Sequence, residues 1–391
     1  MSKLKELIDR LCPDGVEYKP LDEFIEIYTG EQFNKRDMNL EGSYPVINGG
    51  INPSGYIESF NEVQDTITIS QGGASAGYVA WQDSPFWAGA HCYVVRPKSN
   101  NLINRFLYFF LKNQESYLQQ MQHGAGIPAL NRSKVKKLHI PIPPIEVQKE
   151  IVRILDTFSA HAAELQAELQ AELQARKEQY EYYRNLLLTF NPSACGCGTD
   201  GKQENKDVTT WGGASYTIDW KSIGEICRII TAPKKLNRKY YCKEGKYPII
   251  DQGQDLICGY SNISNANLPE EEYILFGDHT KIVKYYNGAF IQGADGLKIL
   301  KPQKGVLPKY LYHSMKVLQV EDRGYNRHWT VVAPLTIPIP PIELQEKIVS
   351  ILDRFETLVN DLTQGLPAEI AAVKEQYEYY RNKLLTFKQI A

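Results

Sequence analysis

The chain lacks a long apolar run and a cysteine pairing pattern, and these two absences exclude several classes of protein. No uninterrupted apolar stretch in its 391 residues reaches the roughly 18 residues that a membrane span needs. The seven cysteines are scattered and odd in number, and Cys195-Gly-Cys197 does not have the C-x-x-C spacing of a zinc site. Because the first residues form a charged, amphipathic segment rather than a signal peptide, we expect a reduced, cytoplasmic protein that holds no metal.

Catalytic motifs are also missing. The sequence contains no G-x-x-x-x-G-K-S/T phosphate loop, no Asn-Pro-Pro-aromatic motif of the kind found in adenine methyltransferases, and no H-E-x-x-H metal motif. The glycine-rich segment Gly72–Gly77 resembles a phosphate cradle but has no lysine, so a DNA-facing loop or a plain turn is the better interpretation. These absences argue against an enzyme.

Net charge is close to zero. There are 44 basic and 46 acidic side chains, which give a formal charge of −2. The segment 191–343 has only a small basic surplus, 19 residues against 16. Any binding of DNA therefore has to come from local patches or from a partner that supplies more positive charge.

What the sequence does contain is an internal repeat. IPIPPIEVQKEIVRILDTF at 140–158 recurs as IPIPPIELQEKIVSILDRF at 337–355, with 14 identities in 19 positions. KEQYEYYRNLLLTF at 177–190 recurs at 374–387 with one change in 14, at the same offset of 197 residues. Each copy follows a block of about 140 residues that is much less similar. A constant frame with two divergent modules indicates two different readers held at a fixed distance.

The repeated segments have the periodicity of long helices. Apolar residues recur every three or four positions from Ile151 to Leu187 and again from Ile348 to Leu384, and a proline pair precedes each run. Since a single apolar stripe needs a partner stripe, we expect the two helices to pack as an antiparallel coiled coil. A first helix of 44 residues would span roughly 66 Å.

The two copies differ at mid-helix. The first contains three AELQ units at Ala163–Gln174, whereas the second contains Gly365 and Pro367, which should kink or break the helix. The AELQ tract is either a low-complexity filler or a ruler that fixes the separation of the two blocks, and both interpretations stay open.

The blocks between the helices have short strand-like pieces separated by Gly, Pro and Asn, and a helix near 104–121, which is an α+β pattern. The second block repeats this plan weakly. We therefore predict an α+β fold of two similar globular domains joined by two long antiparallel helices, with pseudo-two-fold symmetry. The predicted divisions are 1–145 for the first globular domain, 146–190 for the first helix, 191–213 for a linker, 214–342 for the second globular domain and 343–391 for the second helix.

These features resemble a known family. The IPIPPIExQ motif followed by a long helix ending in KEQYEYYR, present twice, is similar to the specificity subunit of type I restriction–modification systems. The opening segment LCPDGVEY at 11–18 and the segment GAGIPALNRSKVKKLHIP at 124–141 are also similar to that family. The resemblance covers essentially the whole chain.

The resemblance implies a division of labour. Each recognition domain would read one half of a split, asymmetric DNA site, and the coiled coil would set the spacer. The helices would dock two modification subunits that methylate adenine with S-adenosylmethionine. Two restriction subunits would cleave DNA with ATP and Mg²⁺. The specificity subunit itself would carry no cofactor and no catalytic residue.

Candidate DNA contacts lie in loops that mix Lys or Arg for phosphates with Asn, Gln, His or Ser for base edges. A single charged run is more often a solvated face, and for Asn131 or His279 a hydrogen bond within the fold is an equal alternative. The loop 323–329 is the strongest candidate because it combines two Arg, Asn, His, Tyr and Trp. The predicted DNA-binding residues are Lys35, Arg36, Gln71, Ser75, His123, Asn131, Arg132, Lys134, Lys235, Arg238, His279, Lys281, Arg323, Asn326, Arg327 and His328.

Tyrosines on the frame helices divide into two kinds. Tyr180 and Tyr183 lie on the apolar stripe and favour a core position, whereas Tyr182 and Tyr379 lie off it and are the better candidates for docking the modification subunits.

Two other functions compete with DNA recognition. One is a self-contained restriction or methyltransferase enzyme, which methylation by the lone chain would reveal. The other is a coiled-coil scaffold without DNA binding, which salt-dependent binding to DNA would exclude.

Overall fold

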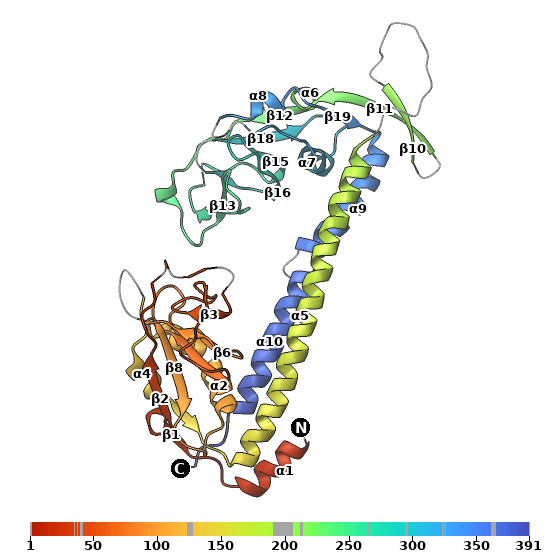
Figure 1. Ribbon diagram of the computed structural model, residues 1–391. Coiled ribbons are helices and arrows are strands. Elements are labelled where there is room, and N and C mark those ends of the chain that lie inside the picture. The colour runs from red at the N-terminus through yellow and green to blue at the C-terminus, as the bar shows by residue number, and fades with distance from the viewer. Residues whose placement is uncertain are drawn as a thin grey trace. The chain divides into compact units, whose positions relative to one another are not determined.

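The computed structural model describes residues 2–34, 36, 38–39, 42–122, 128–190, 206–211, 214–264, 266–293, 296–322, 324, 326–360 and 365–390. The chain divides into two compact units. Unit 1 is Met1–Leu169 with Glu369–Ala391, and unit 2 is Gln170–Ala368. Both units combine sheets with helices, which confirms the predicted α+β class (Figure 1). No described helix is both long enough and apolar enough to cross a membrane.

Unit 1 begins with a helix and continues with short strands. Its elements are α1 (Ser2–Leu11), β1 (Tyr18–Pro20), β2 (Ile25–Thr29), β3 (Tyr44–Ile47), β4 (Tyr56–Ile57), β5 (Thr66–Ser70), β6 (Val79–Gln82), β7 (Trp87–Ala88), β8 (Cys92–Pro97), α2 (Asn104–Asn113), α3 (Glu115–Gln120), α4 (Arg132–Lys136), β9 (His139–Pro141), the first part of α5 (Ile145–Leu188) and most of α10 (Leu366–Leu385).

Unit 2 follows the same plan. Its elements are the second part of α5, β10 (Lys206–Trp211), β11 (Ala214–Ser222), α6 (Ile223–Ile226), β12 (Cys227–Ile230), β13 (Tyr247–Ile250), β14 (Gly259–Ser261), β15 (Glu271–Gly277), β16 (Val283–Gly288), β17 (Ile291–Gln292), β18 (Leu297–Pro302), α7 (Pro308–Lys316), α8 (Trp329–Val332), β19 (Thr336–Ile339) and α9 (Ile342–Asn360). Strand β10 lies in the segment predicted as a linker and pairs with β11.

Two sheets of each unit have the same topology, whereas the remaining sheet is β1-β9 in unit 1 and β10-β11-β19 in unit 2. Unit 1 has a four-stranded antiparallel sheet in the order β2-β8-β5-β6, and unit 2 has one in the order β12-β18-β15-β16. Each unit also has a three-stranded sheet, β4-β3-β7 or β14-β13-β17, whose last pair is parallel. The weak sequence similarity of the two blocks therefore reflects one fold used twice.

The cores explain why these strands form. In β5 the segment TITIS is buried at every position, and in β15 the segment YILFG is buried throughout. Both strands are central in their sheets, where a strand covered on two faces is apolar without alternation. Helix α2 packs Phe106, Leu107 and Phe110 against the core of unit 1.

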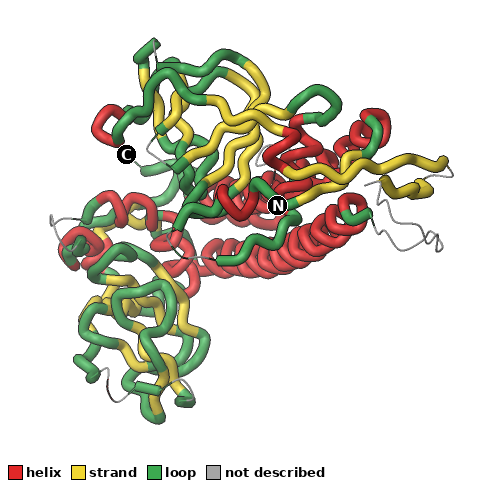
Figure 2. The backbone as a smooth tube through the Cα atoms, turned by 90° about the horizontal axis from the view of Figure 1, so that it is seen from above, coloured by secondary structure: helices red, strands yellow, loops and turns green. Residues whose placement is uncertain are grey.

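Each unit contains one part of the first frame helix and one part of the second. Helix α5 is continuous from Ile145 to Leu188 (Figure 2), but its first part packs with α10 in unit 1 and its second part packs with α9 in unit 2. The ring of Phe158 lies 6.0 Å from that of Tyr380, and the ring of Phe355 lies 5.7 Å from that of Tyr183. Both residues of each pair are 197 positions from their equivalents. The predicted divisions, which kept each helix whole, therefore do not follow the compact units.

The second frame helix is interrupted as predicted. Helix α9 ends at Asn360 and α10 begins at Leu366, immediately before Pro367. The residues 361–364 lie outside the described part of the chain. Gly365 and Pro367 thus account for the start of a new helix, since proline is tolerated in a first helical turn but not in a helix interior.

Both chain ends belong to unit 1 (Figure 1). The amide of Val16 donates to the carbonyl of Lys388 at 2.8 Å, and the amide of Ile390 donates to the carbonyl of Val16 at 3.2 Å. The hydroxyl of Tyr18 donates to the carbonyl of Phe387 at 3.2 Å and accepts the amide of the same residue at 3.0 Å. These contacts hold the last residues against β1.

We expect the Tyr18→Phe substitution to lower the free energy of unfolding by about 1–3 kcal/mol, because it removes both hydrogen bonds to Phe387 and leaves its amide unpaired. Urea unfolding followed by circular dichroism measures the change. Tyr216→Phe is the control, since that hydroxyl only accepts a long contact from an exposed lysine, and it should change stability by less than about 0.5 kcal/mol. Equal losses in the two variants would contradict this role of Tyr18.

Candidate nucleic-acid interface

In unit 1 four connecting loops meet at one end of the sheets. The amide of Leu130 donates to the carbonyl of Gln71 at 2.8 Å, and that of Gly73 donates to the carbonyl of Pro128 at 2.9 Å. The Ser70 hydroxyl donates to the carbonyl of Gly49 at 2.6 Å. These bonds join the loops after β3 and β5 to the loop before α4.

The fourth loop connects β7 and β8 and closes the cluster. The amide of Gln71 donates to the carbonyl of His91 at 2.9 Å, and the amide of His91 donates to the Asn48 side chain at 2.9 Å. A shallow cavity of about 320 Å³ opens beside these loops. Its lining residues are Thr29, Gln71, Tyr93, Ala129, Leu130, Asn131 and Arg132.

The glycine-rich segment is a closed turn at the edge of this cluster. Three of its amides have main-chain partners: that of Ala76 donates to the carbonyl of Gly73 at 3.1 Å, that of Gly77 to Ser70 on β5 at 2.8 Å, and that of Gly73 to Pro128 at 2.9 Å. Gly77 has a φ of 91°, and a Cβ there would lie 2.9 Å from the backbone of α3. Because these amides are used, the turn is a structural element rather than a phosphate cradle.

Unit 2 builds its loop cluster around Asp278, which directly follows β15. The amide of His328 donates to the Asp278 carbonyl at 2.8 Å, and the amide of Trp329 donates to its carboxylate at 2.8 Å. The amide of His279 donates to the Gln252 side chain at 3.2 Å. The Lys281 ammonium lies 3.3 Å from the Asp322 carboxylate, so the loop 322–328 is tied to the loop after β15.

The two clusters correspond position by position. In each unit the residue after the central strand, Gln71 or Asp278, accepts an amide from the segment that leads into a short helix, at Leu130 or His328. The turn after β3 or β13 is bonded to the same place: the Ser70 hydroxyl donates to the carbonyl of Gly49, and the amide of His279 donates to the Gln252 side chain. A common scaffold thus presents two loop sets with different side chains.

The structure brings several predicted site residues to these clusters. Gln71, Ser75, Asn131 and Arg132 gather in unit 1, and His279, Lys281, Asn326 and Arg327 gather in unit 2. Lys235 and Arg238 flank Leu236, whose amide donates to Gln292 on β17 at 3.0 Å. Exposed side chains among the predicted residues are those of Arg36, Asn131, Arg132, Lys134, Lys235, Arg238, Asn326 and Arg327.

Some predicted residues are placed differently. The His328 side chain is 0% exposed, and its Nδ1 lies 3.0 Å from the Asp278 carbonyl, so it supports the loop from within instead of facing a ligand. Asn131 accepts the amide of Ser133 at 2.9 Å and caps α4. Lys35, His123 and Arg323 lie outside the described residues.

Sequence reasoning missed the residues that hold the loops together. Asn48, Ser70 and Gln252 make connecting hydrogen bonds, yet none of these three was singled out. Asp278 was part of a candidate DNA-contacting loop, but its role in holding the loops together was not foreseen. The available signal was the pair of equivalent strand ends, YPVINGG and YPIIDQG, where a polar side chain and a glycine follow a buried strand.

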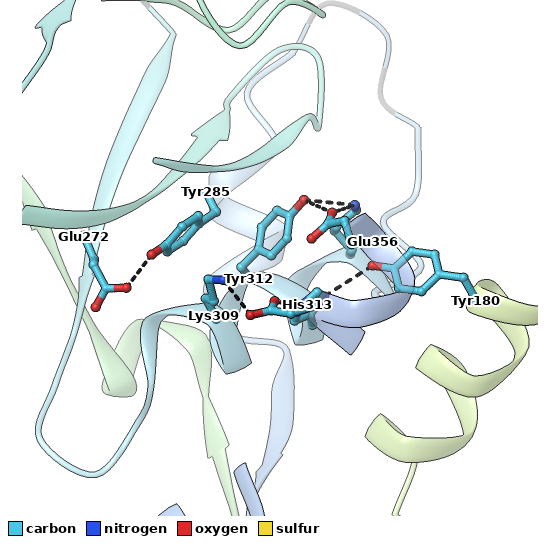
Figure 3. Close-up of polar contacts among 9 residues, drawn as sticks. Tyr180, Glu272, Tyr285, Lys309, Tyr312, His313 and Glu356 are labelled. Atoms are coloured by element: carbon cyan, nitrogen blue, oxygen red, sulfur yellow. Dashed lines mark hydrogen bonds and ion pairs between the residues drawn. The ribbon is translucent and has the colours of Figure 1, made fainter. Parts of the chain in front are cut away.

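A second polar cluster lies where α7 meets the frame helices in unit 2 (Figure 3). The fully buried His313 places Nδ1 3.3 Å from the Tyr180 hydroxyl and Nε2 3.3 Å from the Asp353 carboxylate. Burial raises the pKa of Tyr180 to about 12. Burial alone would raise the pKa of Asp353, but hydrogen bonds from His313 and Lys309 lower it below the usual range.

His313, Asp353 and Glu356 have ligand atoms within 4.8 Å of one another, the spacing of a metal site. However, Lys309 lies 2.5 Å from Asp353, and Lys316 lies 3.3 Å from Glu356. Two ammonium groups already neutralise the two carboxylates, so this donor set fits an ion-pair network better than a cation site.

The frame helices expose tyrosines at equivalent positions. Tyr182 and Tyr379 are 63% and 61% exposed, whereas Tyr180 is 5% exposed, as the apolar stripe predicted. The same stripe predicted a core position for Tyr183, and this prediction is wrong: Tyr183 is 36% exposed, with one face of its ring stacked on Phe355. In unit 1 an apolar groove of about 370 Å³ lies between α5 and α10, lined by Phe158, His161, Ala162, Leu165, Val373, Gln376, Tyr377 and Tyr380.

Comparisons with known proteins agree on one family. The model of the type I restriction modification DNA specificity domain matches residues 13–175 and 217–372. A Haemophilus influenzae protein assigned as a type I restriction enzyme specificity subunit is 34% identical over 396 residues, covering 95% of this chain and 96% of that protein. The Escherichia coli EcoR124I/EcoR124II specificity subunit is 27% identical over 428 residues, covering 99% and 97%. The crystal structure of the Mycoplasma genitalium S subunit is similar in fold, with a TM-score of 0.51, 21% identity and coverage of 95% and 96%.

The cap made by Asn131 separates a structural role from a recognition role. We expect Asn131→Ala to lower the free energy of unfolding by about 1 kcal/mol, because the amide of Ser133 loses its partner, whereas Asn131→Asp keeps the cap and should be nearly neutral. Chemical unfolding of both variants measures this. A loss of equal size in Asn131→Asp would contradict capping by the side-chain oxygen.

Proposed function

The chain belongs to the type I restriction–modification DNA specificity family, and from this premise we propose that it reads a split, asymmetric DNA site, with one half-site for each unit. The observation that carries the proposal is the pair of equivalent loop clusters, which share a scaffold and differ in side chains. Equal scaffolds would present two readers in the same manner, and unequal side chains would select different bases. As a specificity subunit the chain is not catalytic.

DNA contact would come from side chains at and around the two clusters. Arginine and lysine side chains would bind phosphates, and Gln71, Ser75, His279 and Asn326 are the candidates for base edges. His328 is not among the proposed contacts, because its buried ring has no path to a ligand without the loop opening. The proposed cationic contacts are Lys35, Arg36, Arg132, Lys134, Lys235, Arg238, Lys281, Arg323 and Arg327.

The AELQ tract would act as the ruler. The boundary between the two units on α5 falls after Leu169, inside the tract Ala163–Gln174. Extending or shortening a helix at this place changes the distance between the residues that belong to unit 1 and those that belong to unit 2, at about 1.5 Å per residue.

The frame helices would also dock two modification subunits. Tyr182 and Tyr379 are exposed aromatic side chains at equivalent positions, and aromatic residues of this kind are common anchors in protein interfaces. The apolar groove between α5 and α10 would accept a helix from such a partner. S-adenosylmethionine would bind to the modification subunits, ATP and Mg²⁺ would bind to two restriction subunits, and the complex would be cytoplasmic.

Methylome sequencing tests the proposal. This chain is co-expressed with the modification subunit of its own operon in a host without other DNA methylation, and modified adenines are mapped. We expect one split motif with unequal halves and a fixed spacer. If a stable complex forms but no motif is modified, and the complex shows no salt-dependent DNA binding, the alternative of a coiled-coil scaffold without DNA binding is favoured.

Deletion of one AELQ unit should change the spacer by one or two base pairs, because four helical residues correspond to about 6 Å and one base pair to about 3.4 Å. The half-sites should stay the same. The same methylome measurement reads both quantities, and a variant in which the order of Ala167–Gln170 is scrambled without a change in length is the control. Altered half-sites at an unchanged spacer would contradict the ruler.

A further inference from the structure

Each frame motif contains one glutamine that is fully buried. Gln148 and Gln345 are the Q of the two IPIPPIExQ segments, and both are 0% exposed. Gln148 lies near the start of α5 in unit 1, and Gln345 lies near the start of α9 in unit 2. A primary amide in a protein interior is costly unless all of its polar groups are paired.

All of those groups are paired, in the same way in both copies. The Gln148 oxygen accepts the amide of Ile103 at 2.9 Å, and its nitrogen donates to the carbonyls of Asn101 at 2.9 Å and Pro143 at 2.8 Å. The Gln345 oxygen accepts the amide of Leu307 at 2.9 Å. Its nitrogen donates to the carbonyls of Gly305 at 2.9 Å and Pro340 at 2.7 Å.

The partners lie where each recognition domain starts its main helix. Ile103 and Leu307 are the N-cap residues of α2 and α7, and neither makes a side-chain cap of its own. Every bond from the glutamine ends on main-chain atoms. These hydrogen bonds therefore do not depend on the side chains at 101, 103, 305 and 307, which differ between the two domains.

In each unit an ion pair at an equivalent position accompanies the hydrogen bonds of the glutamine. Two residues after each N-cap, a cation bonds to an aspartate of the frame. Arg105 lies 2.8 Å from Asp156, and Lys309 lies 2.5 Å from Asp353. The two aspartates are equivalent residues, 197 positions apart. The frame thus bonds each domain at an equivalent helix start and through a cation at an equivalent position.

We infer that Gln148 and Gln345 are positioning residues that fix the angle and register of α2 on α5 and of α7 on α9, and so hold each recognition domain at a defined distance from the centre of the DNA site. This inference rests on the proposed reading of a split site. A buried apolar residue of similar size would supply packing without direction, whereas three hydrogen bonds to main-chain atoms define one orientation. Through the hydrogen bonds of this glutamine, the length of the frame helices would set the position of each recognition domain.

The test compares the spacer of the methylated motif in complexes that carry substitutions on either side of these hydrogen bonds. Gln148→Glu keeps the acceptor but removes both N–H donors. Ile103→Pro removes the amide donor at a residue whose φ of −71° suits proline. Ile103→Val and Asn101→Ala are the matched controls, because they keep the main-chain groups and change only side chains. Gln345→Glu repeats the experiment in unit 2.

For Gln148→Glu, Ile103→Pro and Gln345→Glu we expect the same half-sites as in the parent, with at least about tenfold more methylation at sites whose spacer differs by one base pair, since one lost buried hydrogen bond corresponds to about a factor of ten. The controls should retain the parental spacer. Thermal unfolding of each complex is recorded in parallel.

A uniform loss of methylation with the parental spacer, in step with a lower Tm, would mean that the glutamines only stabilise the fold and would overturn the inference. Relaxation in Asn101→Ala as well would also overturn it, because the positioning would then depend on side chains. If the parental complex modifies no split motif, the proposed function itself fails and the glutamines have no spacer to define.

Discussion

A long amphipathic helix cannot leave its apolar stripe in water, and in this protein the stripe of α5 is covered by a different helix in each unit. The first part of α5 pairs with α10, and the second part pairs with α9. The equivalent contacts Phe158–Tyr380 and Phe355–Tyr183 show that one packing solution is used twice. Arg184 over Tyr180 and Arg381 over Tyr377 repeat it at the adjacent turn. Each unit is consequently completed by a segment from the other copy of the repeat.

The duplicated frame nevertheless tolerates divergence at its contacts with the recognition domains. In unit 1 the Tyr377 hydroxyl lies 2.8 Å from Ser159, beside a core that contains Phe109. In unit 2 the equivalent Tyr180 lies against His313, with Glu356 at the position equivalent to Ser159. A junction with a hydroxyl–hydroxyl hydrogen bond and a junction with a histidine and a carboxylate therefore occupy the same place. The buried glutamine is unchanged in both, which indicates that the common geometry depends on main-chain bonds.

The repeat and the helices could be predicted from the sequence because periodicity and proline placement are local signals. The α+β class, the helix break near Gly365 and the burial of Tyr180 follow from such signals. The pairing of the first part of α5 with α10 and of its second part with α9 agrees with the predicted antiparallel arrangement. The division of each frame helix between two compact units was not predicted, because it depends on the contacts that each part makes in space. The loop clusters were found only in part. The burial of His328 and the capping by Asn131 depend on carbonyls and amides from distant segments, and those contacts leave no pattern in residue type.

The hydrogen bonds between Val16 and residues 388–390 have a consequence for the order of folding during synthesis. Unit 2 is one contiguous segment, Gln170–Ala368, and all of it leaves the ribosome before the last turns of α10 exist. Unit 1 contains residues 1–169 but also needs residues 369–391, so Phe158 and Leu165 lack their partner helix until α10 has been synthesised. Although domains generally fold from the N-terminus onward, here the second unit can be complete before the first. A truncated chain without α10 would expose the apolar stripe on the first part of α5, where a chaperone or a protease would recognise it.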